Sequence, residues 1–356
     1  MFIKVFLLNN KKGEIEMKKV IIPAMIVLVS CVLCFTGCGG KSAMELNLAH
    51  FWPAVHPVET DLVQPWIKAV SEATEGKVKV TSFPAETLLK SDAIYEGIKQ
   101  GVADLGLSCY AYTRGKFPVM EVFELPGIVY NNSDAATRIA WEGLKLLNPK
   151  EIQDTTHFMV FTTGPGNLFT KAPVKNLNDL KGMEIRATGL SAATLKALGA
   201  VPVAMPQADA WESLSKGIVK GNLGPTEILK GWRQAEVTSY ITITPFLYNT
   251  LFFFTMNTGK WNKISKKDQE AILKINNKFF EEVACGLWDK QDKAAHTYAV
   301  NEKKMQVIEL SKDEQEKWIS LIKPMLNDFV SKMNGQGFDG KKILDTVQTL
   351  SAKYNK

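Results

Sequence analysis

The residue with the clearest chemical potential in this sequence is an arginine at the end of a short β-type run. Arg186 is the fourth residue of the run 183–187, and Thr188 and Gly189 follow it at the expected start of a helix. A guanidinium at the carboxyl end of a strand, beside free helix N–H groups, is well placed to hold a carboxylate by two hydrogen bonds. From this local pattern alone, a surface arginine in a salt bridge is an equal alternative.

Two further groups of residues carry weaker signals. His50 and His56 are close in sequence, but Pro53 and Pro57 interrupt any helical spacing between them, so we expect no metal site there. The tripeptide 164–166 (GPG) could approach a phosphate, although such a sequence is more typical of a turn or a domain crossover. The sequence therefore predicts neither a metal nor a cofactor.

Short catalytic signatures are missing from the chain. It contains no GxGxxG, GxxxxGK[ST], HExxH, GxSxG or paired CxxC pattern. These patterns mark many dinucleotide, phosphate, zinc and acyl-transfer sites, so their absence argues weakly against an enzyme.

The elements that must position Arg186 alternate along the chain. From residue 44 onward, short β-type runs alternate with amphipathic stretches, which predicts an α/β fold. The run 251–258 (LFFFTMNT) is apolar without alternation, as expected for a strand covered on both faces. Ser265 and Ser311 each begin a capping pattern before a long charged helix. We expect strands at 44–50, 77–83, 103–108, 157–162, 183–187, 201–204, 221–224, 237–242 and 251–258, and helices at 57–75, 93–100, 134–147, 191–198, 207–216 and 266–300.

The amino terminus has the features of an export signal. Residues 20–35 form an uncharged run of 16, which is shorter than the roughly 20 apolar residues of a membrane-spanning helix. Lys18 and Lys19 supply a positive flank, and Met17 before them is a plausible start, with 1–16 as an upstream mis-start. We therefore expect residues 1–37 to be a signal peptide.

The end of this signal resembles a bacterial lipobox. Phe35-Thr36-Gly37-Cys38 precedes a small and polar stretch, and cleavage before Cys38 would make that cysteine the lipidated first residue. Phe35 departs from the leucine that the pattern prefers, and ordinary cleavage nearby is the alternative. Two or more acyl chains would anchor the protein firmly, so we expect a lipid-anchored protein outside the cytoplasm with residues 38–43 as a tether.

Composition indicates a globular chain with two domains. The 356 residues are 46% hydrophobic and 22% charged, and this length exceeds the usual size of a single core. The net charge is +6, of which the first 37 residues hold +3, and the rest has no basic block. A nucleic-acid partner is therefore disfavoured. Beyond Cys38 only Cys109 and Cys285 remain, and two buried free thiols are a simpler interpretation than one disulfide.

Several segments in order resemble the extracytoplasmic solute-binding proteins of tripartite ATP-independent periplasmic (TRAP) transporters. The resemblance runs from about residue 46 to about residue 330. It is carried by LAHFWPAVHPV, SEATEGKVKVTSFPAETLL, KQGVADLGLS, NLNDLKGMEIRATG, MPQADAWESLSKGIVKGNLGPTEILKGW, AEVTSYITITPF and LFFFTMNTGKW.

The resemblance implies a two-lobed binding protein that closes like a hinge on a small organic acid and performs no chemistry. It would deliver the ligand to a membrane permease that is driven by an ion gradient without an ATPase. Crossings between lobes would fall near 163–164 and 249–251, and a long helix after Ser265 would span both lobes. The implied domains are 44–163 plus 251–290 for lobe I, 164–250 plus 291–330 for lobe II, and 331–356 for a carboxy-terminal helical segment.

Carried over residue by residue, the carboxylate-binding arginine of the family falls on Arg186. A second arginine of some members falls near Gly166, and a glutamate of others falls near Cys109, so both charges are missing here. The asparagine that some members carry just before a GVVDG-like turn falls on Gly217, and the usual aspartate of that turn falls on Lys220. The pocket therefore has a reduced polar set.

Aromatic residues lie near the segments that would form the cleft. With charge replaced by glycine and cysteine, these rings favour a monocarboxylate with an apolar or aromatic body. Each ring could instead be part of the core. The expected ligand contacts beside Arg186 and Gly166 are Phe51, Trp52, Cys109, Tyr110, Tyr112, Trp211, Asn222, Pro225 and Glu227, with Trp232 as a further candidate.

Four alternatives stay open from the sequence alone. Within the same class, the ligand could be a dicarboxylate or a sugar acid. The chain could also be a receptor of an ATP-driven importer. A periplasmic hydrolase or lyase would need a base beside Arg186, for which His50 or His56 would have to serve. A purely structural lipoprotein would have no use for an arginine in a cleft.

Overall fold

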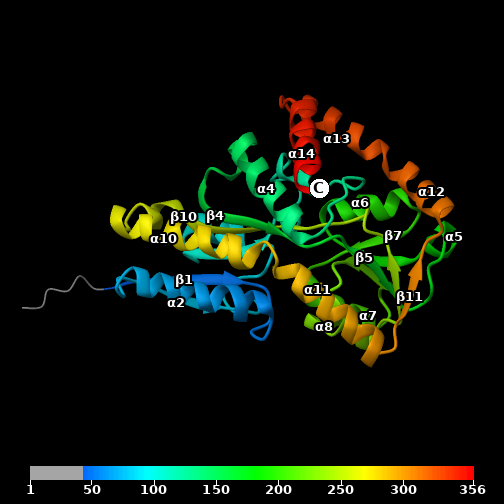
Figure 1. Ribbon diagram of the computed structural model, residues 1–356, viewed down its shortest axis with the longest axis horizontal. Coiled ribbons are helices and arrows are strands. Elements are labelled where there is room, and N and C mark those ends of the chain that lie inside the picture. Colours follow the sequence, from blue (N-terminus) through cyan, green and yellow to red (C-terminus); the bar gives the residue numbers. More distant parts are fainter. Residues whose placement is uncertain (1–42) are drawn as a thin grey trace, which may run out of the picture. The chain divides into compact units, whose positions relative to one another are not determined.

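The computed structural model describes residues 43–356, which fold around two mixed β-sheets with helices on their faces. The strand order is β2-β1-β3-β10-β4 in the first sheet and β11-β9-β5-β8-β6-β7 in the second. Figure 1 shows the first sheet on the left and the second on the right. The α/β prediction is therefore confirmed. The first sheet contains β1 (Met44–His50), β2 (Val78–Phe83), β3 (Leu105–Cys109), β4 (Thr155–Thr162) and β10 (Leu251–Asn257).

Helices cover both faces of the first sheet. One face packs against α2 (Gln64–Ala73) and α10 (Lys266–Phe279), which contribute Trp66 and Ile272 to a shared core. The other face packs against α3 (Ile94–Gln100), α4 (Ser133–Leu147) and α14 (Gly340–Tyr354). Each face thus has its own hydrophobic core.

Strand β10 explains why an apolar run need not alternate. It lies between β3 and β4 and pairs antiparallel with both. Phe252 and Phe254 belong to the core on one face, whereas Leu251 and Phe253 belong to the core on the other. Successive side chains alternate between faces, so a strand with two covered faces can carry apolar residues at consecutive positions.

The second sheet is also mixed. Strand β5 pairs antiparallel with β8 and β9, β6 pairs parallel with β7 and β8, and β11 pairs parallel with β9. Its strands are β5 (Asn167–Thr170), β6 (Glu184–Ala187), β7 (Val201–Ala204), β8 (Gly221–Gly224), β9 (Tyr240–Ile243) and β11 (Gln306–Glu309). Its helices include α5 (Leu177–Leu180), α6 (Gly189–Ala197), α7 (Gln207–Ser215), α8 (Ile228–Gly231) and α12 (Lys312–Ile322).

Two chain segments pass between the sheets and pair with each other. Residues 163–166 lead from β4 to β5, and residues 244–250 lead from β9 back to β10. Thr163 N–H donates to Thr250 C=O at 3.0 Å, and Gly166 N–H donates to Tyr248 C=O at 2.9 Å. A paired double crossing of this kind is the geometry of a hinge. The lobe limits drawn from the sequence stay a prediction.

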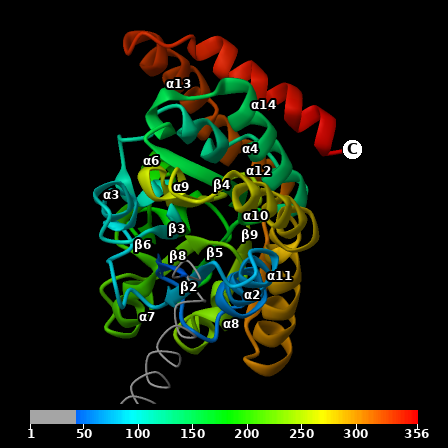
Figure 2. The same ribbon diagram turned by 90° about the vertical axis from the view of Figure 1, so that its left-hand side faces the viewer.

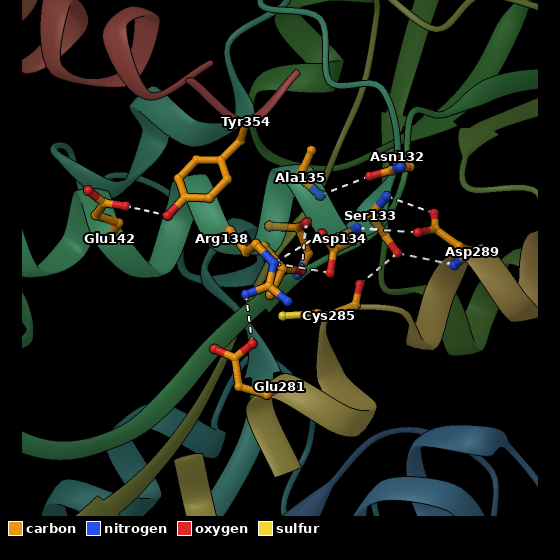
Figure 3. Close-up of polar contacts among 12 residues, drawn as sticks. Asn132, Ser133, Asp134, Ala135, Arg138, Glu142, Glu281, Cys285, Asp289 and Tyr354 are labelled. Atoms are coloured by element: carbon orange, nitrogen blue, oxygen red, sulfur yellow. Dashed lines mark hydrogen bonds and ion pairs between the residues drawn. The ribbon is translucent and has the colours of Figure 1, made fainter. Parts of the chain in front are cut away.

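The helix expected over 266–300 is interrupted in the structure. Helix α10 ends at Phe279, a π-helical stretch covers Phe280–Ala284, and a turn at Cys285 and Gly286 precedes α11 (Leu287–Thr297). Ser133 satisfies the polar groups at the turn: its hydroxyl donates to Cys285 C=O and accepts from Asp289 N–H, each at 3.1 Å (Figure 3). The Asp289 carboxylate accepts from Ser133 N–H at 2.7 Å, so this turn is fixed to the start of α4.

The carboxy-terminal helices return to the first sheet. After α12, α13 (Pro324–Gly335) leads to α14, which packs against α4, as Figure 2 shows. Lys353 and Tyr354 both bond to Glu142 of α4. Shorter elements complete the fold: π-helical stretches Val58–Val63 and Tyr298–Glu302, helix α9 (Thr258–Trp261), and 3₁₀ turns at Tyr110–Thr113, Met120–Glu124, Lys150–Ile152 and Gln234–Glu236.

Candidate functional site

A cavity lies where segments that follow the strands of both sheets meet. The free space that remains is small, about 30 Å³ for the centres of water-sized molecules, which is room for one or two waters. The side chains therefore nearly fill this closed arrangement, and a larger ligand needs the two sheets to move apart. The lining residues are Phe51, Trp52, Cys109, Tyr112, Thr163, Arg186, Thr188, Gln207, Pro225, Glu227, Ile228, Trp232, Tyr248, Thr250 and Phe252.

Arg186 is held in place by its own sheet. It lies on β6, opposite Val203 of β7 and Asn222 of β8, and only 2% of it is exposed. Its Nε–H donates to Met205 C=O at 3.0 Å, and one Nη–H donates to Asn222 Oδ1 at 3.4 Å. A guanidinium has five N–H donors, so three remain for other partners. A bidentate carboxylate contact needs two of them.

The charge of Arg186 lacks a carboxylate partner within the described residues. Among these, the arginines in ion pairs are Arg138 and Arg233. Burial raises the pKa of the Cys109 thiol and of the Tyr112 hydroxyl above their ordinary ranges, and the nearby Arg186 charge offsets only part of this shift. Both groups are therefore neutral, and the cavity offers a buried cation without a counter-ion beside it.

Aromatic rings from segments of both sheets form one wall of the cavity. Phe51 stacks on Trp52 with ring centres 3.9 Å apart and meets the edge of Tyr112 at 5.4 Å. Trp232 lies roughly parallel to Phe51 at 6.1 Å, and Phe252 meets Trp52 edge-on at 5.1 Å. Such rings offer a large apolar surface to a flat ligand.

A buried histidine–carboxylate contact lies at the edge of the cavity. His56 Nε2 is 3.2 Å from Glu227 Oε2, and both side chains are buried. His56 Nδ1 accepts from Val58 N–H at 3.1 Å, so the ring proton lies on Nε2 and is donated to Glu227. Glu227 N–H in turn donates to Asp292 at 2.7 Å. Burial and the Glu227 charge raise the Asp292 pKa well above its usual value.

The structure brings together seven of the eleven residues expected from the sequence. They are Phe51, Trp52, Cys109, Tyr112, Arg186, Pro225 and Glu227. Trp232, the further candidate, lines the cavity as well.

Two expected aromatic contacts lie elsewhere. Tyr110 faces the opposite core of the first sheet, where its ring stacks on His157 and its hydroxyl lies 2.7 Å from His157 Nε2. Trp211 is 36% exposed and lines a separate outer groove of about 570 Å³, with Arg233 above its ring. Glu227 and Trp232 line both spaces. Neither Tyr110 nor Trp211 lines the cavity.

Gly166 and Asn222 lie just behind the cavity wall. A Cβ atom on Gly166 would fall 2.3 Å from the Tyr248 ring and 2.8 Å from Gly224 C=O, so only glycine fits beneath that tyrosine. Tyr248 thus lines the cavity beside Gly166, the position near which the second arginine of some family members falls. Asn222 is fully buried and accepts a hydrogen bond from Arg186.

Several lining residues were not identified from the sequence. Thr163, Tyr248 and Thr250 lie on the paired crossing segments, whose expected positions near 163–164 and 249–251 were the signal that could have found them. Thr188, Gln207, Ile228 and Phe252 also line the cavity, and their types alone gave no reason to select them.

The two histidines belong to separate networks. His50 Nε2 is 2.8 Å from Glu59 Oε2, whereas His56 contacts Glu227. Within residues 43–356, no three His, Cys, Asp or Glu side chains are close enough to hold a metal ion. Cys109 and Cys285 are both buried and free, as predicted.

The predicted signal peptide and Cys38 lie outside the described residues. In the part of the chain that the structure describes, no helix is long and apolar enough to cross a membrane.

Comparison with known proteins places the chain in a family. Residues 48–333 match the family model of the bacterial extracellular solute-binding proteins, family 7, known as DctP. The chain belongs to this family, the solute-binding proteins of TRAP transporters. Members are periplasmic solute-binding receptors that work with a membrane permease, so the chain is a receptor of this type and not an enzyme. This family membership excludes a periplasmic hydrolase or lyase and a receptor of an ATP-driven importer.

Two solved structures show the same fold. A marine metagenome TRAP solute-binding protein specific for aromatic acid ligands, in complex with metahydroxyphenylacetate, is 28% identical; the alignment covers 88% of this chain and all of that chain, with a TM-score of 0.83. A TRAP solute-binding protein from Rhodoferax ferrireducens T118, with copurified benzoate, is 27% identical over 88% of this chain and 98% of its own, with a TM-score of 0.80. Both are two-lobed TRAP proteins.

Another relative is named after a ligand that is not an aromatic acid. The 2,3-diketo-L-gulonate-binding periplasmic protein YiaO of Escherichia coli K12 is 26% identical over 220 residues. The match covers 57% of this chain and 63% of that protein.

Proposed function

We propose that this receptor captures a monocarboxylate with an aromatic or apolar body and holds its carboxylate through Arg186. The observation that carries the proposal is a buried guanidinium without a carboxylate partner among the described residues, in a cavity walled by aromatic rings. A buried cation without an anion is costly, so an anionic ligand that enters when the two sheets move apart stabilises a form closed around it. The aromatic acids bound by two relatives support this ligand class.

The closed form would then deliver its ligand to the membrane permease. Residues from both sheets line the cavity, so a ligand that contacts both favours closure by its differential affinity for the two states. Uptake in a host that carries the matching permease should require this receptor and an ion gradient. Uptake that persists without the receptor would contradict this role.

A thermal-shift screen tests the ligand class. Wild-type residues 39–356 are measured with benzoate, 3-hydroxybenzoate, mandelate, succinate, 2-oxoglutarate and 2,3-diketo-L-gulonate. Ligand at a hundredfold over its Kd adds about 2.7 kcal/mol to the free energy of unfolding, which raises Tm by several degrees. We expect shifts with the aromatic monocarboxylates. Shifts only with succinate or the sugar acid would overturn the proposed ligand class.

Arg186→Met tests the carboxylate contact, and Arg233→Met is its matched control. Arg233 is exposed, pairs with Glu236 and does not line the cavity. Loss of a charge-assisted contact to a buried carboxylate costs about 2–5 kcal/mol, so affinity should fall at least 30-fold in Arg186→Met and stay within twofold in Arg233→Met. Equal affinity of the two variants, measured by calorimetry, would disprove the role of Arg186.

A sugar acid is the second candidate ligand, because the Escherichia coli relative is named as a 2,3-diketo-L-gulonate-binding protein. Its several hydroxyl groups would need polar partners throughout the cavity. The stacked Phe51, Trp52 and Trp232 offer none on their faces, which is why we place this candidate second.

We also propose that lipid on Cys38 tethers the receptor to the membrane. This follows from the lipobox-like segment 35–38. Expressed in a bacterial host, the wild-type protein should incorporate labelled palmitate and stay with the membrane fraction. Cys38→Ser should do neither, and a label retained by that variant would exclude this anchor.

A further inference from the structure

We infer that Gln207 is a second ligand-binding residue, whose side-chain amide donates a hydrogen bond to the carboxylate held by Arg186. The inference rests on the proposed function and deepens it. Gln207 is the first residue of α7, lines the cavity and is 7% exposed. Its Nε2 is buried and has no hydrogen-bond partner among residues 43–356.

The direction of the amide follows from a hydrogen-bond chain that begins at Arg186. A guanidinium can only donate, so Asn222 must present its Oδ1 to Arg186. Its Nδ2 then faces two glutamines and donates to Gln207 Oε1 at 3.3 Å and to Gln234 Oε1 at 2.9 Å. Both glutamines therefore accept from Asn222, and both must point their own amide hydrogens away from it.

The two glutamines at the end of this series of hydrogen bonds differ in their surroundings. Nε2 is unpartnered in both, but only Gln207 lines the cavity, whereas Gln234 is fully buried behind Asn222. A buried donor without a partner is costly and needs a physical reason. For Gln207 that reason is an acceptor supplied by the ligand, next to the guanidinium to which Asn222 links it.

The backbone of Gln207 adds a closure contact at the same point. Gln207 N–H donates to Tyr112 Oη at 3.0 Å, and Tyr112 follows β3 of the first sheet. The residue is therefore fixed at both ends when the cavity is closed. A carboxylate has about four lone-pair positions, so it can accept from Arg186 and from Gln207 together.

The pair Gln207→Met and Gln234→Met tests the inference, with benzoate, 3-hydroxybenzoate and mandelate as probes in calorimetry. Each variant removes one acceptor of Asn222, so any indirect effect on Arg186 should be similar in the two. A hydrogen bond to a charged group predicts a 10- to 100-fold loss of affinity in Gln207→Met. In Gln234→Met we expect less than a threefold loss.

The outcomes separate this inference from the proposed function. Equal affinities in both variants, or equal losses, would overturn the direct contact while the wild-type binding upholds the ligand class. Failure of the wild-type protein to bind any of the three probes would overturn both. If Gln207→Met does not fold, the side-chain amide resonances of Gln207 in ¹⁵N-labelled wild-type protein give the second test. They should shift on saturation with benzoate, and unshifted resonances would refute the contact.

Discussion

At the scale of residues, two tyrosines two positions apart lie in different surroundings. Tyr112 lines the cavity and accepts from Gln207 N–H, whereas Tyr110 belongs to the core behind the first sheet. Strand β3 ends at Cys109, and a 3₁₀ turn carries both tyrosines. Strand alternation no longer holds in such a turn, so their directions were not predictable from sequence.

Replacing each tyrosine with phenylalanine tests this difference. Tyr112→Phe removes the acceptor for Gln207 N–H in the closed form, and one lost hydrogen bond predicts a 3- to 10-fold loss of affinity for benzoate. Tyr110→Phe loses only the contact with His157, so affinity should be unchanged while Tm falls. Calorimetry and thermal unfolding of both variants check this. A larger affinity loss in Tyr110→Phe would contradict the assignment.

The candidate site was predictable from sequence only in part, for reasons visible at single residues. Arg186 was identifiable because strand, arginine and helix start are consecutive in the chain. Gln207 was not, because the direction of its free amide follows from its contact with Asn222, which lies 15 residues away along the chain and meets Gln207 only in the fold. Gly166 was predicted as the ligand contact in the crossing segment, but the ring of Tyr248 occupies the space next to this glycine.

At the scale of elements, the interrupted helix between the sheets depends on one serine. A continuous helix was expected over 266–300 because its amphipathic pattern continues through Cys285 and Gly286. In the structure α10 gives way to a π-helical stretch that breaks at Cys285 and Gly286, and glycine is a poor helix former. Ser133 bonds to the backbone groups that this break leaves free. Sequence could not show this, since Ser133 lies more than 150 residues away.

Ser133→Ala should destabilise this junction. It removes the donor to Cys285 C=O, which is buried, and the acceptor for Asp289 N–H, which is partly buried. We expect a loss of about 1–3 kcal/mol in the free energy of unfolding, measured by urea titration. Ser320→Ala is the control, because its exposed hydroxyl bonds only to Lys317 C=O within its own helix. Similar losses in the two variants would refute the role of Ser133.

At the scale of the whole molecule, a buried glutamate lies between the hinge segment and the start of α6. Glu124 accepts from Leu251 N–H at 2.7 Å, where the returning segment enters β10. Its other oxygen lies 3.5 Å from the position that a Cβ atom would occupy on Gly189, the first residue of α6. Burial raises the Glu124 pKa to about 8. The side chain is therefore mostly protonated at neutral pH.

This pKa predicts how stability depends on pH. Because the folded-state pKa lies above the ordinary value of 4.5, the contribution of Glu124 is fully present below about pH 4.5 and is lost as pH rises through about 8. Glu124→Gln cannot ionise, so its Tm should fall less than that of the wild type between pH 5 and 9. Glu151 and Asp292, whose pKa values burial also raises, are present in both proteins. Parallel Tm curves would show that Glu124 does not titrate in this range.

The position of β10 has a consequence for chain synthesis. The strand lies between β3 and β4, yet it follows both by about 90 residues or more and comes after almost the whole second sheet. Until it is made, β3 has one unpaired edge and β4 has no partner strand among the described residues. Open edges of apolar strands favour association between chains. An amino-terminal fragment that stops at residue 163 should therefore aggregate rather than fold. During synthesis of the full chain, the first sheet cannot be completed until β10 has been made.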